Sequence, residues 1–182
     1  GTFSFSRLET LFVMSQSTTQ HRCDSPKSVR CAVVTVSDTR TLETDRGGLL
    51  VAELLAAGGH QVMSREIVPD DPARIGPLLQ RLADPGAVDA ILLTGGTGIC
   101  ARDQTFETVS GLLDKTMPGY GELFRMLSYE DIGPAAMLSR AVGGVVNNVI
   151  LLTMPGSVAA VRLAMEKLIV PEVGHLVYEA RK

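Results

Sequence analysis

Apolar runs alternate with helical patterns through the first half of the chain. A near-continuous apolar run at 29–36 and a shorter one at 89–94 are typical of strands buried on both faces, and a further strand is expected at about 61–68. Helices are expected between them, at 47–57 and 72–83. This alternation predicts a parallel sheet with helices on both faces and right-handed crossovers.

The pattern changes after the third strand. Residues 103–114 can form a helix, the Pro/Gly-rich stretch 117–121 is expected to break it, and a further helix covers about 121–128. Ser157 is a candidate N-cap for a later helix, and Pro171 allows a restart into a last one.

Two short β-rich runs, 141–146 and 149–153, are separated only by Asn147-Asn148, and they predict a hairpin because asparagine tolerates positive φ. The expected fold is therefore α/β, a three-layer sandwich with a mainly parallel central sheet and a small C-terminal β-hairpin. We expect one domain over residues 29–182, preceded at 1–28 by a disordered lead-in or an upstream segment.

Composition narrows the class of protein. The 182 residues carry a net charge of −3, which argues against a general nucleic-acid binder, so a phosphate ligand would be attracted by local groups. Three widely spaced cysteines without a CxxC pattern indicate neither a disulfide framework nor a zinc site, and they fit a reduced, cytoplasmic protein. No apolar run approaches the roughly 18 residues of a membrane span.

The strand at 89–94 runs directly into a glycine turn made of Gly95, Gly96, Thr97 and Gly98. A glycine turn between a strand and a helix exposes backbone amides, which is typical of an anion site. Glycine also lets the backbone approach a phosphate closely. Asp103 follows shortly afterwards, where a carboxylate can hold Mg²⁺. The turn therefore predicts a ligand that carries phosphate.

Other interpretations of this turn stay open. Residues 96–101 formally match the GxGxxA dinucleotide fingerprint, but they follow the third strand, and the expected acidic position falls in a Pro/Gly-rich loop and a helix. No Gly-Lys-Ser/Thr follows the glycines, so a P-loop is not supported. A structural turn without a ligand is the remaining alternative.

Further polar residues follow other strand ends. Ser37, Asp38 and then Asp45 come after the first strand, and the carboxyl ends of parallel strands share one edge of a sheet. Each alone is commonly a cap or turn residue, but two Asp-bearing loops that converge on one edge favour a site. Ser139-Arg140 and residues 155–157, taken alone, are explained by turn and cap chemistry.

Six motifs resemble one known family in their order: Thr35–Arg40, Asp45–Gly48, Thr94–Gly98 with Arg102-Asp103, Pro118–Glu122, Ser139-Arg140 and Met154–Ser157. They are similar to the MoaB/Mog family of molybdenum cofactor biosynthesis proteins, and the stretches 121–130 and 132–140 are similar to its MoaB branch. The resemblance covers about residues 29–182 and implies a three-layer α/β fold that binds molybdopterin.

The resemblance implies an enzyme, a molybdopterin adenylyltransferase. Such a protein uses ATP and Mg²⁺ to adenylylate the terminal phosphate of molybdopterin, which prepares the cofactor for a downstream molybdenum-insertion protein. It assembles as a homotrimer or homohexamer. Some members of the MoaB branch bind without catalysing, so a non-catalytic pterin-phosphate binding protein is the alternative function. An NAD-dependent enzyme is a third.

The matching motifs also imply site residues. The expected catalytic residues are Asp103, which would hold Mg²⁺, and Asp38. The expected substrate-binding residues are Ser37, Asp45, Gly95, Gly96, Thr97, Gly98, Ser139, Arg140, Pro155, Gly156 and Ser157. Two prolines that the family usually carries are replaced, one within Ile99–Ala101 and one at Phe106. Because proline fixes φ, their loss is expected to loosen the loop.

Overall fold

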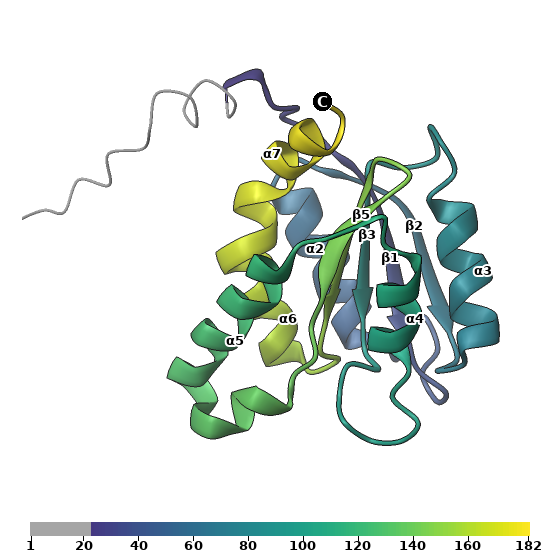
Figure 1. Ribbon diagram of the computed structural model, residues 1–182, viewed down its shortest axis with the longest axis vertical. Coiled ribbons are helices and arrows are strands. Elements are labelled where there is room, and N and C mark those ends of the chain that lie inside the picture. Colours follow the sequence, from purple (N-terminus) through teal and green to yellow (C-terminus); the bar gives the residue numbers. More distant parts are fainter. Residues whose placement is uncertain (1–22) are drawn as a thin grey trace, which may run out of the picture.

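One mixed sheet organises the structure, a computed structural model that describes residues 23–182 (Figure 1). Its strands are β1 (Arg30–Val36), β2 (Gln61–Val68), β3 (Ala90–Thr94), β4 (Lys115–Thr116), β5 (Gly143–Val146) and β6 (Val149–Met154). They lie in the order β2-β1-β3-β6-β5-β4. The pairs among β2, β1, β3 and β6 are parallel, whereas β5 pairs antiparallel with both β6 and β4.

Helices cover both faces of this sheet. They are α2 (Arg46–Ala57), α3 (Pro72–Leu82), α4 (Thr105–Leu112), α5 (Pro118–Ile132), α6 (Val158–Ala164) and α7 (Val170–Ala180), with a 3-10 helix η1 (Gly133–Leu138) and a π-helical turn η2 (Met165–Ile169). One core cluster packs α2, α5, α6 and α7 against Cys31 and Val33 of β1. The other packs α3 and α4 against Ala32 and Val34. Because alternate residues of a strand point to opposite faces, the predicted three layers are confirmed.

The predicted strands at 29–36, 61–68 and 89–94 are confirmed as β1, β2 and β3. The predicted hairpin is also present, formed by β5 and β6, and Asn147 and Asn148 in its turn have φ of 48° and 63°. It is not a separate small unit, because β6 also pairs with β3 in the middle of the sheet.

Three local details differ from the prediction. The predicted break between two helices is present, but it ends earlier than expected, because α4 ends at Leu112 and α5 already begins at Pro118. At the first helical position the missing N–H of proline has no intrahelical partner to lose, so proline is tolerated there. The helix expected at 103–114 begins only at Thr105. The strand β4 was not predicted, since two residues are too few to show an alternating pattern.

Residues 1–22 of the predicted lead-in lie outside the described part of the chain. Within the remainder, Pro26 lies so close to α7 that a Cβ placed on Gly174 would be 2.5 Å from the Pro26 carbonyl oxygen. The boundary between lead-in and domain stays a prediction. Within residues 23–182, no helix combines the length and the apolar character that crossing a bilayer requires.

A buried carboxylate ties the start of β3 to β1 and to the end of the chain. Asp89 accepts hydrogen bonds from the backbone and the guanidinium of Arg30, both at 2.8 Å, and from Arg181 at 2.6 Å. Burial alone would raise the pKa of Asp89, but the hydrogen bonds from Arg30 and Arg181 outweigh it and hold the pKa at about 2.

This depressed pKa predicts a specific acid sensitivity. The folded-state pKa lies below the unfolded value of 3.8, so the contribution of Asp89 to stability is complete above about pH 4 and is lost as the pH falls through about 2. Urea unfolding of the wild type and of Asp89→Asn should therefore differ clearly at pH 6 and much less at pH 2.5. Asp84→Asn, an exposed carboxylate nearby, is the control, and a constant difference at both pH values contradicts the assignment.

Candidate functional site

The carboxyl ends of β1, β3 and β6 lie side by side, at the lower edge of the sheet in Figure 1. Parallel pairing brings together the loops that follow Val36, Thr94 and Met154. The segment after β2 joins this edge through a hydrogen bond of 3.0 Å from the backbone amide of Asp70 to Asp38 Oδ1. The predicted convergence of the Asp-bearing loops on one edge is therefore confirmed.

The glycine turn lies between the ends of β1 and β6. Gly95 has a φ of 100°, and a Cβ on it would be 2.4 Å from the carbonyl oxygen of Val36. Gly96 has a φ of 66°, and a Cβ there would be 2.2 Å from Thr105 Oγ1. The amide of Gly95 donates to the carbonyl of Met154 at 3.0 Å. Only glycine fits both the backbone conformation and this close approach.

The geometry of the expected anion site differs from the prediction. The glycine turn does not open a helix, because residues 97–104 form a loop before α4 begins at Thr105. Thr105 instead binds the turn, donating from Oγ1 to the Gly95 carbonyl and from its amide to the Gly96 carbonyl. The amides of Gly96, Thr97 and Gly98 have no acceptor among residues 23–182. Consecutive free amides of this kind make a concavity that suits an anion.

These three residues line a pocket of about 410 Å³, which we call the glycine-loop pocket. Asp103 stands on the same side, and its Oδ2 accepts from the amide of Cys100 at 3.1 Å. The opposite wall is largely apolar and comes from α5 and η1, including Phe124, Ile132 and Leu138. The pocket is completed by Gly95, Ser139, Pro155, Gly156 and Ser157, among others.

A second pocket of about 330 Å³, the strand-end pocket, adjoins the first and shares Gly95, Gly156 and Ser157 with it. Asp45 lines this pocket but is only 3% exposed. Its carboxylate caps α2 through the amide of Gly48 and accepts from Thr35 Oγ1 at 2.7 Å. Asp45 therefore has a structural role, and its predicted contact with substrate stays a prediction.

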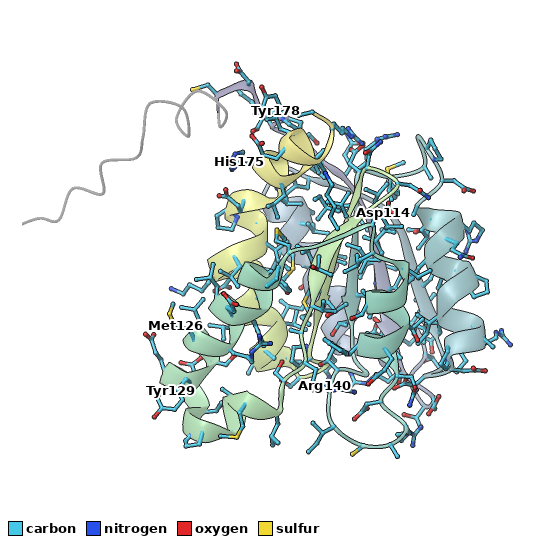
Figure 2. The ribbon with its side chains drawn as sticks, in the orientation of Figure 1. Asp114, Met126, Tyr129, Arg140, His175 and Tyr178 are labelled. Atoms are coloured by element: carbon cyan, nitrogen blue, oxygen red, sulfur yellow. The ribbon has the colours of Figure 1, made fainter. Side chains whose placement is uncertain are left out.

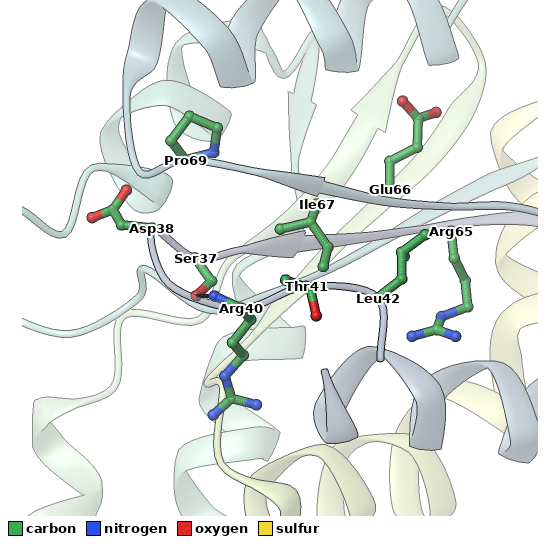
Figure 3. Close-up of a pocket in the computed structure, with 9 residues that line it drawn as sticks. All are labelled: Ser37, Asp38, Arg40, Thr41, Leu42, Arg65, Glu66, Ile67 and Pro69. Carbon is green, nitrogen blue, oxygen red and sulfur yellow. Dashed lines mark hydrogen bonds between the residues drawn. The ribbon is translucent and has the colours of Figure 1, made fainter. Parts of the chain in front are cut away.

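A third pocket of about 620 Å³, the arginine pocket, lies between the loop after β1 and the strand β2 (Figure 3). It shares Ser37 and Arg40 with the strand-end pocket. Asp38 lies here, in an ion pair with Arg102. Asp38, Asp45 and Asp103 therefore line three adjoining pockets along this edge of the sheet.

Arg140 is the one predicted site residue that lines none of these pockets. It contacts the glycine loop from the other side, donating from Nε to the Gly98 carbonyl at 2.8 Å and from Nη2 to the Asp103 carbonyl at 3.0 Å. Its backbone amide donates to the Thr97 carbonyl at 3.0 Å. Figure 2 shows Arg140 at the lower edge of the sheet, beside this loop. In the structure Arg140 holds the loop, and its predicted contact with substrate stays a prediction.

Two neighbours from α4 hold Arg140 in turn. The Phe106 ring lies 5.2 Å from the guanidinium carbon, and Glu107 forms an ion pair with Nη1. The hydrogen bond from Arg140 lowers the pKa of Glu107 below its ordinary value. The end of the glycine loop is therefore held by side-chain contacts with α4.

One carboxylate at this edge, Asp70, was not predicted from the sequence. Asp70 accepts the amide of Gln104 at 3.1 Å, and thereby links the segment after β2 to the end of the glycine loop. Burial raises the pKa of Asp70, and the nearby charges of Asp103 and Glu107 raise it further. Its position directly after a predicted strand was the available signal, by the same edge argument that singled out Asp38.

Weakening the Arg140 contacts is expected to destabilise the loop. Lysine keeps the charge but cannot donate to two carbonyls from one rigid fork, so Arg140→Lys should lose about 1–2 kcal/mol of unfolding free energy. Hydrogen exchange of the amides of residues 97–104 should become faster. Arg74→Lys, on the exposed side of α3, serves as the control. Unchanged exchange in Arg140→Lys would show that Arg140 does not hold the loop.

Residues 32–175 match the model of a family described as a probable molybdopterin binding domain. A protein of Halalkalibacterium halodurans named molybdenum cofactor biosynthesis protein B is 53% identical over 90% of this chain and 96% of its own length. The protein of that name from Bacillus subtilis is 49% identical over 90% of this chain and 96% of its own length.

Comparison with solved structures points to the same family. A crystal structure of a molybdenum cofactor biosynthesis protein B is 55% identical, covers 86% of this chain and 98% of its own, and superposes with a TM-score of 0.83. The tungsten cofactor synthesizing protein MoaB from Pyrococcus furiosus is 36% identical, covers 87% of this chain and all of its own, and has a TM-score of 0.76.

Proposed function

The chain belongs to the probable molybdopterin-binding domain family, among the MoaB proteins of molybdenum cofactor biosynthesis, and from that premise we propose that it adenylylates the terminal phosphate of molybdopterin with ATP and Mg²⁺. One observation carries the proposal. Gly96, Thr97 and Gly98, whose amides have no acceptor among residues 23–182, line the same pocket as Asp103, opposite an apolar wall. Amides suit a phosphate, and an apolar wall suits a flat ring system such as a pterin.

The proposed reaction is a nucleotidyl transfer. A phosphate oxygen of molybdopterin forms a bond to the α-phosphorus of ATP, and the bond from that phosphorus to the oxygen bridging to the β-phosphate breaks. The electron pair leaves with pyrophosphate. The attacking oxygen is already anionic, so no general base is required. The chain's contribution is to align the two phosphates and to offset their charge through the glycine-turn amides.

Asp103 is the residue proposed to hold Mg²⁺. Among the described residues, no three His, Cys, Asp or Glu side chains are grouped so that they could hold a metal ion alone. This fits Mg²⁺, which is commonly bound by one or two carboxylates together with substrate phosphates and water. The metal ion supplies charge neutralisation at the reacting phosphates. Asp38, paired with Arg102 in the arginine pocket, would act by positioning.

Ser139 and Ser157 are proposed to contact the pterin or its phosphate. Both line the glycine-loop pocket, and the Ser157 hydroxyl accepts from the amide of Ala160 at 3.2 Å, so its proton stays free to donate. Pro155 and Gly156 shape the wall beside them. The adenylylated product would pass to a molybdenum-insertion protein.

The direct test mixes the purified protein with molybdopterin, ATP and Mg²⁺ and follows adenylylated pterin by mass spectrometry. Product should form with ATP and should be absent when the α,β-methylene analogue replaces ATP or when Mg²⁺ is chelated. If molybdopterin binds and no product forms, the chain is a non-catalytic pterin-phosphate binding protein, and adenylyl transfer is excluded. If the protein instead binds NAD as its cofactor, both the adenylyltransferase and the pterin-phosphate binding protein are excluded.

An apolar face of α5 and η1 supports the homo-oligomer that the family resemblance implies. Large side chains are exposed there, among them Leu123, Met126, Tyr129, Ile132 and Met137, which are between 47% and 73% exposed. Figure 2 shows Met126 and Tyr129 pointing away from the sheet. Exposed apolar patches commonly mark subunit contacts. Sedimentation should give a trimer or hexamer, and Tyr129→Glu should dissociate it; a wild-type monomer would refute the assembly.

A further inference from the structure

We propose that the arginine pocket binds the pyrophosphate part of the nucleotide, the β- and γ-phosphates before transfer and the released pyrophosphate after it. This inference rests on the adenylyl transfer proposed above and assigns it a leaving-group site. Three features carry it: unmatched positive charge, donors without acceptors, and continuity with the glycine-loop pocket.

The arginine pocket holds one cation that has no carboxylate partner. Two carboxylates and two guanidiniums line it, from Asp38, Glu66, Arg40 and Arg65. Asp38 is paired with Arg102, Glu66 with Arg81 at 2.8 Å, and Arg65 with Asp45 at 3.4 Å. Arg40 has no carboxylate or other acceptor for its guanidinium within residues 23–182. In a chain of net charge −3, such a local cation is what attracts an anion.

Unused hydrogen-bond donors point to the same ligand class. Arg65 reaches Asp45 only from Nη2, at 3.4 Å, and its Nε is buried without any acceptor in the described structure. A buried donor without an acceptor costs free energy, so the guanidinium of Arg65 keeps hydrogen-bonding capacity that the described residues leave unused. The Ser37 hydroxyl accepts from the amides of Thr39 and Arg40, which leaves its proton free to donate.

The three pockets form one row along the edge of the sheet. Ser37 and Arg40 line both the arginine pocket and the strand-end pocket, and the latter shares Gly95, Gly156 and Ser157 with the glycine-loop pocket. Arg40 therefore stands at the passage between them, and in Figure 3 its side chain points away from the ends of β1 and β2. A phosphate chain that starts at the glycine turn would extend past Arg40 into the arginine pocket.

Pyrophosphate matches this arrangement better than a single phosphate or a carboxylate. It spreads several charges over two phosphoryl groups, and Arg40 and Arg65 approach the pocket from two different elements, the loop after β1 and the strand β2. The planar guanidinium also pairs with two phosphate oxygens at once, which an ammonium group cannot do. The proposed reaction itself supplies pyrophosphate as its product.

Titration calorimetry with inorganic pyrophosphate in the presence of Mg²⁺ tests the site on the whole chain. The wild type should bind pyrophosphate more tightly than orthophosphate, and Arg40→Ala should weaken pyrophosphate binding by about tenfold or more. Arg40 is exposed and its side chain has no described partner, so this variant should fold as the wild type does, which circular dichroism checks. Arg74→Ala, on α3, is the matched control and should bind normally.

Kinetics give an independent measure. Arg40→Ala should raise the KM for ATP about tenfold or more and leave the dissociation constant for molybdopterin unchanged. Wild-type protein that binds no pyrophosphate, or Arg40→Ala protein that binds it as tightly as the wild type, overturns the proposal. If pyrophosphate binds through Arg40 but no adenylylated pterin ever forms, the transfer reaction fails and the anion site stands. If adenylylated pterin forms although the protein binds no pyrophosphate, the transfer reaction stands and the anion site is refuted.

Discussion

Asp103→Asn is expected to lower the rate of adenylyl transfer by about 100- to 1,000-fold, the effect typical of removing one group that stabilises transition-state charge. Asparagine has the same shape and can still accept the amide of Cys100 through its side-chain oxygen, so the loop should keep its conformation. What is lost is the negative charge that would hold Mg²⁺ beside the glycine turn. The measurement is initial rate against Mg²⁺ concentration, where the variant should need far more Mg²⁺.

The control for Asp103→Asn is Asp131→Asn, because Asp131 is exposed on α5 just before Ile132 of the pocket wall and lines no pocket itself. Its rate should stay close to that of the wild type. Molybdopterin binding without nucleotide should survive in both variants. A normal rate in Asp103→Asn at low Mg²⁺ would show that another group holds the metal ion.

Gly95→Ala is expected to have the largest effect on the fold itself. A side chain here must adopt a φ of 100°, and its Cβ would be 2.4 Å from a backbone oxygen of β1 that cannot rotate away. Backbone strain and forced overpacking together should cost about 2–5 kcal/mol of unfolding free energy. The displaced turn should also lose phosphate binding. Chemical denaturation measures the first effect, and calorimetry with molybdopterin measures the second.

Gly111→Ala is the matched control for Gly95→Ala. Gly111 lies inside α4, and a Cβ there would meet nothing within 4 Å. Alanine in such a position should stabilise the protein by about 0.5–1 kcal/mol, because it restricts the unfolded chain. A similar loss of stability in both variants would mean that the contact with Val36 is not the cause.

The central strands could be predicted from sequence because burial on both faces leaves a continuous apolar run, as at 29–36. The turn at Asn147-Asn148 could be predicted because few residues tolerate its backbone conformation. The contacts of Arg140, in contrast, could not be predicted from the sequence. Its position beside a candidate motif suggested ligand binding, whereas its partners at residues 97–107 come from a distant segment. No local pattern encodes which of two remote segments a side chain contacts.

The same limit applies to the partners of the side chains around the pockets. The edge argument brings Asp38, Asp45 and Asp103 to one side of the sheet, and this is where the structure has them. The position of a residue at this edge does not specify which partner its side chain contacts. Asp45 is taken up by capping α2 and binding Thr35, and Asp38 by pairing with Arg102. These partners depend on side-chain reach of a few ångströms, which spacing along the chain does not specify.

Phe106, Glu107 and Arg140 form one contact group, although Glu107 and Arg140 are 33 positions apart in the sequence. A substitution at any one of them changes how much the other two contribute to holding the loop. A chain that acquired proline at 106 would lose the ring beside Arg140 while gaining a stiffer backbone, so the two solutions are alternatives rather than additions. The effects of substitutions at these three positions should therefore be non-additive, because each side chain keeps its conformation only with the other two in place.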